Sequence, residues 1–467
     1  MIRASFLAAA LGLAACSNTL LAEPVKLARS APLGVALEAS LDGPGARVRS
    51  VIPGTTGAAL GLREGDVVFS LNNQPVADVP ALVALAGRLK AGQRVRLELL
   101  RGGRQRTLTG KAVGRPLETY PGAQVSYGAV PFAGGHLRDI LLLPEARPDA
   151  PVVMLLPGFS CISIEPPSPD HPYRALGAGL LTRGIGYYRV EKPGMGDSSG
   201  TPNCAEITYE TEVAAFAAAY RHLIEVRGIP RERIFLFGHS LGGLQAPMLA
   251  PDQPPRGIAV YGTVLRNWAD YHLAVRTFQP YLINGEPAGT VYADAMGERE
   301  LFDQFYFEDR SPADLAQQNP AWGPILRDVM GWDGGERLLG RNYRFVQALA
   351  DQNLPAAWQG AYSNVLSIYG ESDVVALFDT DHMLIADIVD YARPGTGEYA
   401  LIPGADHAMQ HIGSRDEFRR RAIADENLPQ GAFEPLVVKT LADWIESSMR
   451  RPPVALLKAG TPPAPSS

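Results

Sequence analysis

The pentapeptide Gly238-His239-Ser240-Leu241-Gly242 lies between an apolar run, 234–237, and a stretch rich in small residues, 243–250. This succession is typical of a buried strand that turns sharply into a helix. Glycines two positions before and after the serine let the backbone turn so tightly that the hydroxyl stands clear of its neighbours. The sequence therefore predicts Ser240 as a nucleophile on a strand-to-helix turn; a glycine-serine turn without chemistry is the alternative.

A nucleophilic serine needs a base and an orienting acid, and a fold with this turn presents them downstream in the order serine, acid, histidine. Asp373 follows the apolar run 364–369, and His407 lies in the loop that leaves the apolar run 399–402. Both positions are at the carboxyl ends of predicted strands, where side chains reach the same edge of a sheet. We expect His407 to be the general base and Asp373 the carboxylate that orients it.

Other residues compete for these two roles. The chain has eight histidines, and only His382, His407 and His411 follow Asp373. His411 is the competing base, since it lies four residues beyond His407 and can share a helical face with it. His382 belongs to a predicted helix and is expected at the surface. Asp379 and Asp381 are the alternatives to Asp373.

Hydrolysis of an acyl bond also needs donors for the charge that develops on the carbonyl oxygen. The first expected donor is the backbone N–H of Leu241, which directly follows the serine at a helix start. The second is the N–H of Phe159, in the loop that leaves the predicted strand 152–156. These two amides form the expected oxyanion hole.

Three motifs carry a resemblance to a known family. They are the serine turn, the segment 157–159, which is similar to a His-Gly-x oxyanion segment with Pro in place of His, and the segment 191–200, which is similar to a G-x-G-x-S loop. Residues from about 120 to 450 thus resemble the α/β-hydrolase superfamily, including its serine aminopeptidase and lysophospholipase-like members. The resemblance implies an α/β fold with a mostly parallel sheet covered by helices on both faces. We interpret 191–200 as an architectural turn beside the active site.

An insertion of about a hundred residues, 264–361, separates the serine from the acid and is far longer than a simple connection. We expect it to be a helical cap over the active site. It holds many aromatic side chains, which either form the cap's own core or line an apolar acyl pocket. They are Trp268, Tyr271, Phe278, Tyr281, Phe302, Phe305, Tyr306, Phe307, Trp322, Trp332 and Trp358.

A separate unit, 32–112, precedes the hydrolase. Runs at 48–52, 67–71 and 95–100 predict strands, the last one closing the unit, and leucines at helical spacing predict a helix over 79–89. The glycine-rich segment 53–66 resembles the bacterial PDZ domain, a small β-sandwich or barrel-like fold. The resemblance implies a groove that binds an extended peptide or a protein C-terminus. Its carboxylate-binding loop would be formed by Leu33, Gly34 and Val35.

The first 22 residues have the pattern of an export signal, with a short basic start, an apolar stretch and a segment ending at Cys16 that resembles the lipoprotein box. We expect lipidation of Cys16 and an outer-membrane anchor facing the periplasm. The alternative is cleavage near Ala22, which gives a soluble periplasmic form. Residues 451–467 are rich in Pro, Ala and Ser and predict a disordered tail.

Export changes the interpretation of the two other cysteines, Cys161 and Cys204. Both lie in loops that leave consecutive strands facing the active site, and in an oxidising compartment we expect them to form a disulfide. Two cysteines without nearby paired histidines lack a usable ligand set, so we expect no metal site and no cofactor.

Length and charge fit this organisation. A chain of 467 residues accommodates two or three domains, here 32–112, a linker with the first hydrolase strands at 113–150, and a hydrolase domain at 151–450. A net charge of −6 argues against a nucleic-acid partner. We expect hydrolysis of a carboxylic ester with a small or medium apolar acyl group. The alternatives are a peptidase to which the PDZ groove presents polypeptide, and a catalytically silent PDZ scaffold.

Overall fold

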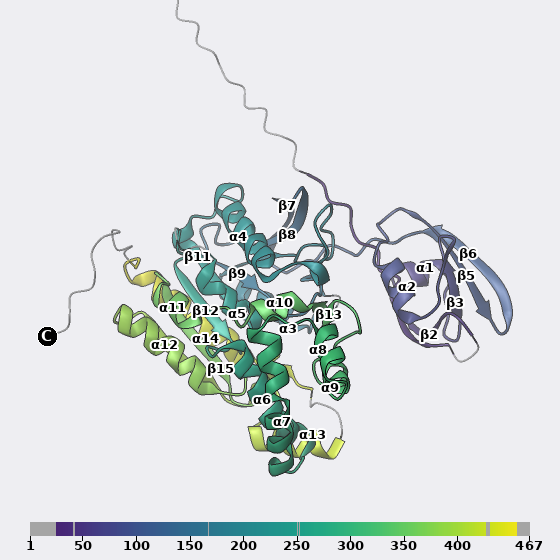
Figure 1. Cartoon of the computed structure of the whole chain (residues 1–467). Helices are drawn as coiled ribbons and strands as arrows, with labels where there is room; N and C mark the ends of the chain where they lie inside the picture. The colour runs from purple at the N-terminus through teal and green to yellow at the C-terminus, as the bar shows by residue number, and fades with distance from the viewer. Residues whose placement is uncertain are drawn as a thin grey trace, which may run out of the picture.

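The computed structural model describes residues 25–454 except 41–42, 167, 250, 252 and 426–429. The expected signal segment with Cys16 and the tail beyond residue 454 lie outside the described residues. A small N-terminal domain and a larger α/β domain follow one another along the chain (Figure 1). Among the described residues, no helix combines the length and the apolar character that a bilayer crossing requires.

The N-terminal domain is an antiparallel sheet in the order β1-β2-β3-β5-β6, with the short β4 (Gln74–Pro75) paired to β3. Its strands and helices are β1 (Val35–Ala39), β2 (Ala46–Val51), β3 (Val67–Leu71), β5 (Arg94–Arg101), β6 (Arg104–Lys111), α1 (Thr56–Leu60) and α2 (Val79–Ala86). The predicted strands are present, but β5 does not close the unit, because β6 pairs with it along its whole length. The helix predicted to reach residue 89 ends earlier, at the Gly87 cap.

The larger domain is built on an eight-stranded sheet in the order β16-β15-β12-β11-β9-β10-β8-β7. Its strands are β7 (Ala123–Phe132), β8 (Gly135–Pro144), β9 (Val152–Leu156), β10 (Gly186–Val190), β11 (Ile234–His239), β12 (Gly257–Tyr261), β15 (Asn364–Gly370) and β16 (Gly397–Ile402). Only the pairings that involve β8 are antiparallel. The expected mostly parallel sheet is therefore confirmed.

Helices bury both faces of this sheet, which explains why its central strands are almost continuously apolar. One face packs against α3 (Pro172–Thr182) and α14 (Pro435–Arg450). The other face packs against α4 (Tyr209–Glu225), α5 (Leu241–Gln245) and α12 (Asp379–Ala392).

The insertion is helical, with α6 (Trp268–Asn284), α7 (Ala288–Phe307), α8 (Pro312–Gln318), α9 (Trp322–Asp328), α10 (Tyr343–Ala348) and α11 (Leu354–Gln359). Phe302, Phe305, Tyr306 and Trp322 are buried in a core of the insertion itself. Trp358 instead packs into the main core beside the sheet, so the end of the insertion belongs structurally to the hydrolase layer.

Candidate active site

Ser240 occupies the turn between β11 and α5, with φ 54° and ψ −121°. This is an unfavourable conformation for a residue with a side chain, and the surrounding backbone maintains it. The Ser240 N–H donates to the Tyr261 carbonyl at 2.9 Å. A Cβ atom at Gly238 would lie 2.6 Å from the Gly242 carbonyl oxygen, and one at Gly242 would lie 2.0 Å from the Leu156 carbonyl oxygen. Gly238 is therefore required for β11 to turn closely into α5, and Gly242 is required for the turn to pack against β9.

Asp373 and His407, which follow neighbouring strands, meet at the same edge of the sheet. The His407 Nδ1 atom lies 2.8 Å from Asp373 Oδ2, and the carboxylate is fully buried. Its other oxygen accepts the N–H groups of Val375 at 2.8 Å and Ala376 at 2.7 Å. Burial raises the pKa of Asp373, but the His407 ring and these hydrogen bonds outweigh it and leave the pKa below its usual value. Burial lowers the pKa of His407, and the Asp373 carboxylate outweighs burial, so that pKa is raised.

Ser240 and His407 both line a cavity of about 380 Å³. It is lined by Pro157, Gly158, Phe159, Ser160, Ile162, His171, Pro172, Tyr173, His239, Ser240, Val375, His407, Ala408 and Gln410. Among these residues there is no Asp, Glu, Lys or Arg, and none comes from the insertion 264–361. The aromatic rings beside the serine are thus Phe159 and Tyr173, not the insertion aromatics considered as a possible acyl pocket.

Of the two residues predicted to supply oxyanion donors, Phe159 lines this cavity and Leu241 directly follows Ser240, which also lines it. Leu241 begins α5 directly after Ser240. A Cβ atom at Gly158 would lie 3.3 Å from the Ser240 Cβ, so the Gly158–Phe159 peptide passes close to the serine. Within the described part of the chain, the N–H groups of Phe159 and Leu241 have no hydrogen-bond acceptor. Both are available to a substrate oxygen.

Sequence reasoning missed a chain of hydrogen bonds among residues that line the same cavity as Ser240. The Tyr173 hydroxyl lies 2.8 Å from His239 Nδ1 and accepts the Gly158 N–H at 3.0 Å, and His239 Nε2 lies 2.8 Å from the His407 carbonyl oxygen. Burial lowers the pKa of His239 to about 3, so the ring is neutral at pH 7. A neutral ring satisfies both contacts when Nδ1 accepts and Nε2 donates. His239 therefore connects the Gly158 loop to the His407 loop; its place next to Ser240 was the only sequence signal.

The competing residues lie elsewhere. His382 is fully buried, not exposed as expected: its Nδ1 lies 2.8 Å from Ser367 Oγ, and its Nε2 accepts the Thr263 N–H. His411 is 59% exposed and pairs with Glu434. Asp381 pairs with Arg266, and Asp379 is exposed.

A disulfide joins Cys161 and Cys204. The bond connects the loop after β9, two residues beyond Phe159, to the segment that follows β10. It closes a sequence separation of 43 residues and lies beside the candidate oxyanion loop.

We predict that replacing both Cys161 and Cys204 with Ala lowers the free energy of unfolding by about 4 kcal/mol, the loop-closure entropy for a ring of this size. Urea unfolding of the variant and of the wild type measures this loss. In reductant the wild type loses the disulfide, so its free energy of unfolding should equal that of the variant. Equal unfolding midpoints for oxidised wild type and variant would contradict the prediction.

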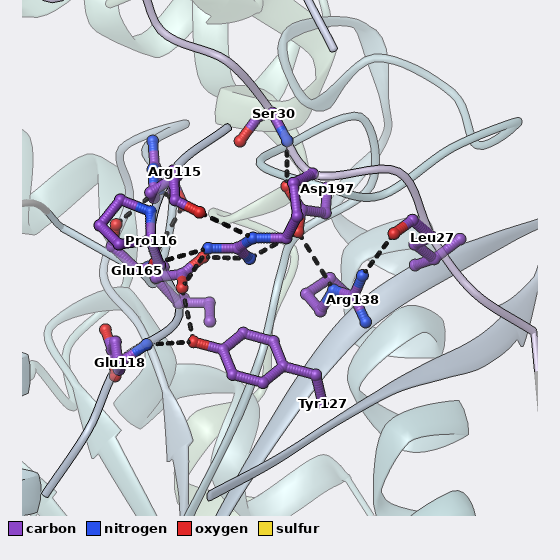
Figure 2. A network of polar contacts seen from close by, with 12 residues as sticks. Leu27, Ser30, Arg115, Pro116, Glu118, Tyr127, Arg138, Glu165 and Asp197 are labelled. Carbon is purple, nitrogen blue, oxygen red and sulfur yellow. Dashed lines mark hydrogen bonds and ion pairs between the residues drawn. The ribbon is translucent and has the colours of Figure 1, made fainter. Parts of the chain in front are cut away.

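A polar network attaches the segments that enter and leave the N-terminal domain to two active-site loops (Figure 2). Arg29 binds Glu165 at 2.7 Å and Asp197 at 2.6 Å, and both carboxylates are buried. The Ser30 N–H also donates to Asp197, at 2.6 Å, and Arg115 donates to the Ser163 hydroxyl at 2.9 Å. Glu165 and Ser163 lie in the loop after β9, so this loop is held by residues that flank the N-terminal domain.

Replacing Arg29 with Ala is expected to lower the free energy of unfolding by about 3 kcal/mol, because it leaves buried carboxylates without their main cation. Denaturant unfolding tests this expectation. Arg49→Ala is the matched control, since Arg49 is 66% exposed and lies 3.8 Å from Glu38, and its effect should stay within about 0.5 kcal/mol. If Arg29→Ala and Arg49→Ala lowered the free energy of unfolding equally, the polar network would not stabilise the fold, and the prediction would be wrong.

Comparison with known proteins agrees with this architecture. A family model described as PDZ domain matches residues 31–111, and one described as alpha/beta hydrolase family matches residues 152–421, which is more than half of the chain. A mostly parallel sheet with a serine on a strand-to-helix turn is typical of the alpha/beta hydrolases. The chain belongs to the alpha/beta hydrolase family and carries an N-terminal PDZ domain.

Curated relatives match short stretches. The chain is 41% identical over 61 residues to the periplasmic serine endoprotease DegP of Escherichia coli (strain K12), a match covering 13% of each chain. It is 30% identical over 128 residues to the magnetosome formation protease MamE of Paramagnetospirillum magneticum, covering 27% of this chain and 16% of MamE. The chain thus spans only about an eighth of the length of DegP.

Solved structures match about two thirds of the chain at low identity. Est1E from Butyrivibrio proteoclasticus with bound ferulic acid has a TM-score of 0.43 and 16% identity, covering 69% of this chain and 99% of Est1E. Proline iminopeptidase from Mycobacterium smegmatis has a TM-score of 0.41 and 19% identity, with coverages of 69% and 99%.

Proposed function

We propose that this hydrolase cleaves carboxylic esters with a small or medium apolar acyl group, with Ser240 as nucleophile, His407 as general base and Asp373 as the orienting carboxylate. The observation that carries the proposal is that Ser240 and His407 line one cavity while Asp373 holds Nδ1 of the same histidine. His407 then takes the Ser240 proton as the oxygen attacks the acyl carbon, and returns it to the leaving group. The N–H groups of Phe159 and Leu241 stabilise the oxyanion.

The lining of the cavity favours an ester over an amino-terminal peptide substrate. A free α-amino group is charged at neutral pH, and its burial requires a carboxylate partner. The described cavity lining offers none, and its rings and aliphatic side chains fit an uncharged acyl chain. A peptidase is the second candidate, and the observation in its favour is the PDZ domain, which can hold a polypeptide near the serine.

A substrate panel tests the proposal. Wild type and Ser240→Ala are assayed side by side with p-nitrophenyl esters of increasing acyl length and with aminoacyl anilides, and labelled with a fluorophosphonate probe. We expect turnover of the shorter esters and probe labelling, both lost in Ser240→Ala. Turnover confined to the anilides would establish the peptidase instead, and folded wild type that neither labels nor turns over any substrate would support the silent scaffold.

We further propose that the PDZ domain binds a protein C-terminus at Leu33, Gly34 and Val35. β1 is the outermost strand of its sheet, so its free edge can pair with an added peptide strand. Gly34 has φ 69°, and a Cβ there would meet the Thr55 side chain at 2.3 Å, so the loop requires glycine. Peptides with free carboxyl termini should bind and their amidated forms should not; equal binding of both would contradict this role.

For localisation we propose the cell envelope, with a lipid anchor at Cys16. The sequence pattern before Cys16 and the periplasmic description of the DegP relative support this proposal. The intact mass of the mature protein tests it, and a chain that begins at Glu23 without lipid would contradict the anchor.

A further inference from the structure

A buried lysine contacts the peptide unit that carries one of the proposed oxyanion donors. The Lys192 Nζ atom donates to the Gly158 carbonyl oxygen at 2.6 Å, and lies 3.3 Å from the Phe159 carbonyl oxygen. The Gly158 carbonyl and the Phe159 N–H belong to the same planar peptide unit. In a trans peptide these two groups point in opposite directions, so a contact that fixes the oxygen also fixes the direction of the N–H.

We propose that Lys192 is a positioning residue of the oxyanion hole, which acts through the Gly158–Phe159 peptide on the Phe159 N–H. This inference rests on the proposed function. The ammonium group holds the carbonyl on the side away from the cavity and so directs the N–H toward the substrate oxygen. It also draws electron density toward the carbonyl oxygen, which makes the N–H a stronger donor, since hydrogen bonds in a chain polarise one another.

Lys192 lies in a buried cluster of paired charges. Its side chain is 1% exposed, and Glu212, which is fully buried, lies 3.1 Å from Nζ. Burial lowers the pKa of Lys192 to about 8, and the Glu212 carboxylate opposes that shift, so the amine remains mostly protonated at neutral pH. Arg341 from the insertion also binds Glu212. The cluster therefore joins the helix α4, the loop after β10 and the insertion behind the oxyanion loop.

Arg341 provides a matched comparison within the same cluster. Its Nη1 atom donates to the Phe159 carbonyl oxygen at 2.8 Å, and this oxygen belongs to the next peptide unit, Phe159–Ser160, whose N–H is not a proposed donor. Lys192 and Arg341 are both 1% exposed and both pair with Glu212. A purely structural role for the cluster predicts similar losses from either substitution. Positioning through the peptide unit predicts that only the lysine affects the transition state strongly.

The test compares Lys192→Met and Arg341→Met in full-length protein, with a p-nitrophenyl ester and with phenylboronic acid, whose tetrahedral serine adduct places an anionic oxygen in the hole. For Lys192→Met we expect kcat to fall by about 10- to 100-fold with KM within about twofold, and boronate affinity to fall by a similar factor. For Arg341→Met we expect at most about a fivefold fall in kcat. Lys192→Gln keeps a hydrogen-bond donor but has no charge, so its kcat and its boronate affinity should lie between those of Lys192→Met and wild type.

Several outcomes would overturn the inference. They are equal losses of kcat in the two Met variants, an effect of Lys192→Met on KM alone, and wild-type boronate affinity in that variant. If Lys192→Met does not fold, Lys192→Gln is measured in its place, and wild-type kcat there overturns the inference. Lys439→Met, an exposed lysine on α14, is the control for unchanged activity. If wild type turns over the ester and Ser240→Ala does not, the proposed function stands even when the Lys192 variants contradict the positioning role. If wild type shows no turnover, both the proposed function and the inference about Lys192 are overturned.

Discussion

Replacing Asp373 with Asn is expected to lower kcat for ester hydrolysis by about 10⁴-fold while the fold is retained. The reason lies in the partners of the carboxylate. Its Oδ1 atom accepts the N–H groups of Val375 and Ala376, so an Asn side chain must keep its oxygen on that side. Its amide nitrogen then donates to His407 Nδ1, which leaves the ring proton on Nε2. In that tautomer Nε2 cannot take the Ser240 proton.

The pH profile gives a second measurement of the same contact. The Asp373 carboxylate raises the pKa of His407 above its ordinary value, and the base works only when neutral. For wild type, kcat/KM should therefore fall as the pH drops through a value above about 6.5. Loss of the carboxylate lowers the pKa of His407, so the residual activity of Asp373→Asn should persist to lower pH.

Asp379→Asn is the matched control for Asp373→Asn, because Asp379 was the nearby alternative and is exposed. Its activity should stay within about twofold of wild type. If Asp379→Asn lost activity as strongly as Asp373→Asn, or if Asp373→Asn kept more than a tenth of the wild-type kcat, the proposed role of Asp373 would be wrong.

The arrangement of Ser240, Asp373 and His407 could be predicted because each follows a short apolar run. Such runs are local patterns, and the carboxyl ends of parallel strands meet at one edge of a sheet. The residues that support the site left no comparable pattern. Sequence reasoning predicts His382 at the surface because helical spacing does not say which face is buried. Its partners are Ser367, inside β15, and Thr263, just beyond the end of β12.

Lys192 shows the same limit more clearly. In the sequence it is part of a glycine-rich turn, and nothing local indicates that its side chain is buried. Its charge partner Glu212 lies on α4, and Glu212 in turn binds Arg341, which belongs to the distant insertion. Ion pairs between distant residues have no periodicity, so sequence reasoning could predict the turn but not its charge partners.

The buried carboxylate of Glu212 is expected to have a large effect on stability. Glu212 pairs with Lys192 at 3.1 Å and with Arg341, and also accepts a hydrogen bond from Gln245 at 3.0 Å. Glu212→Gln keeps the shape of the side chain but leaves two buried cations side by side without a counter-charge. Breaking a buried pair in this way costs about 3–5 kcal/mol, so the free energy of unfolding should fall by that amount at pH 7.

The pH dependence of this loss distinguishes charge from packing. Burial raises the pKa of Glu212, but its two cations outweigh burial and hold the pKa below the usual value. The stabilisation by its charge is therefore complete above the unfolded-state pKa of about 4.3 and disappears as the pH falls through the lower folded-state pKa. The difference between wild type and Glu212→Gln should shrink over that acid range. Glu210→Gln, an exposed change on the same helix, should stay within about 0.5 kcal/mol of wild type. A difference for Glu212→Gln that stayed constant down to low pH would show that packing, not charge, holds the cluster together.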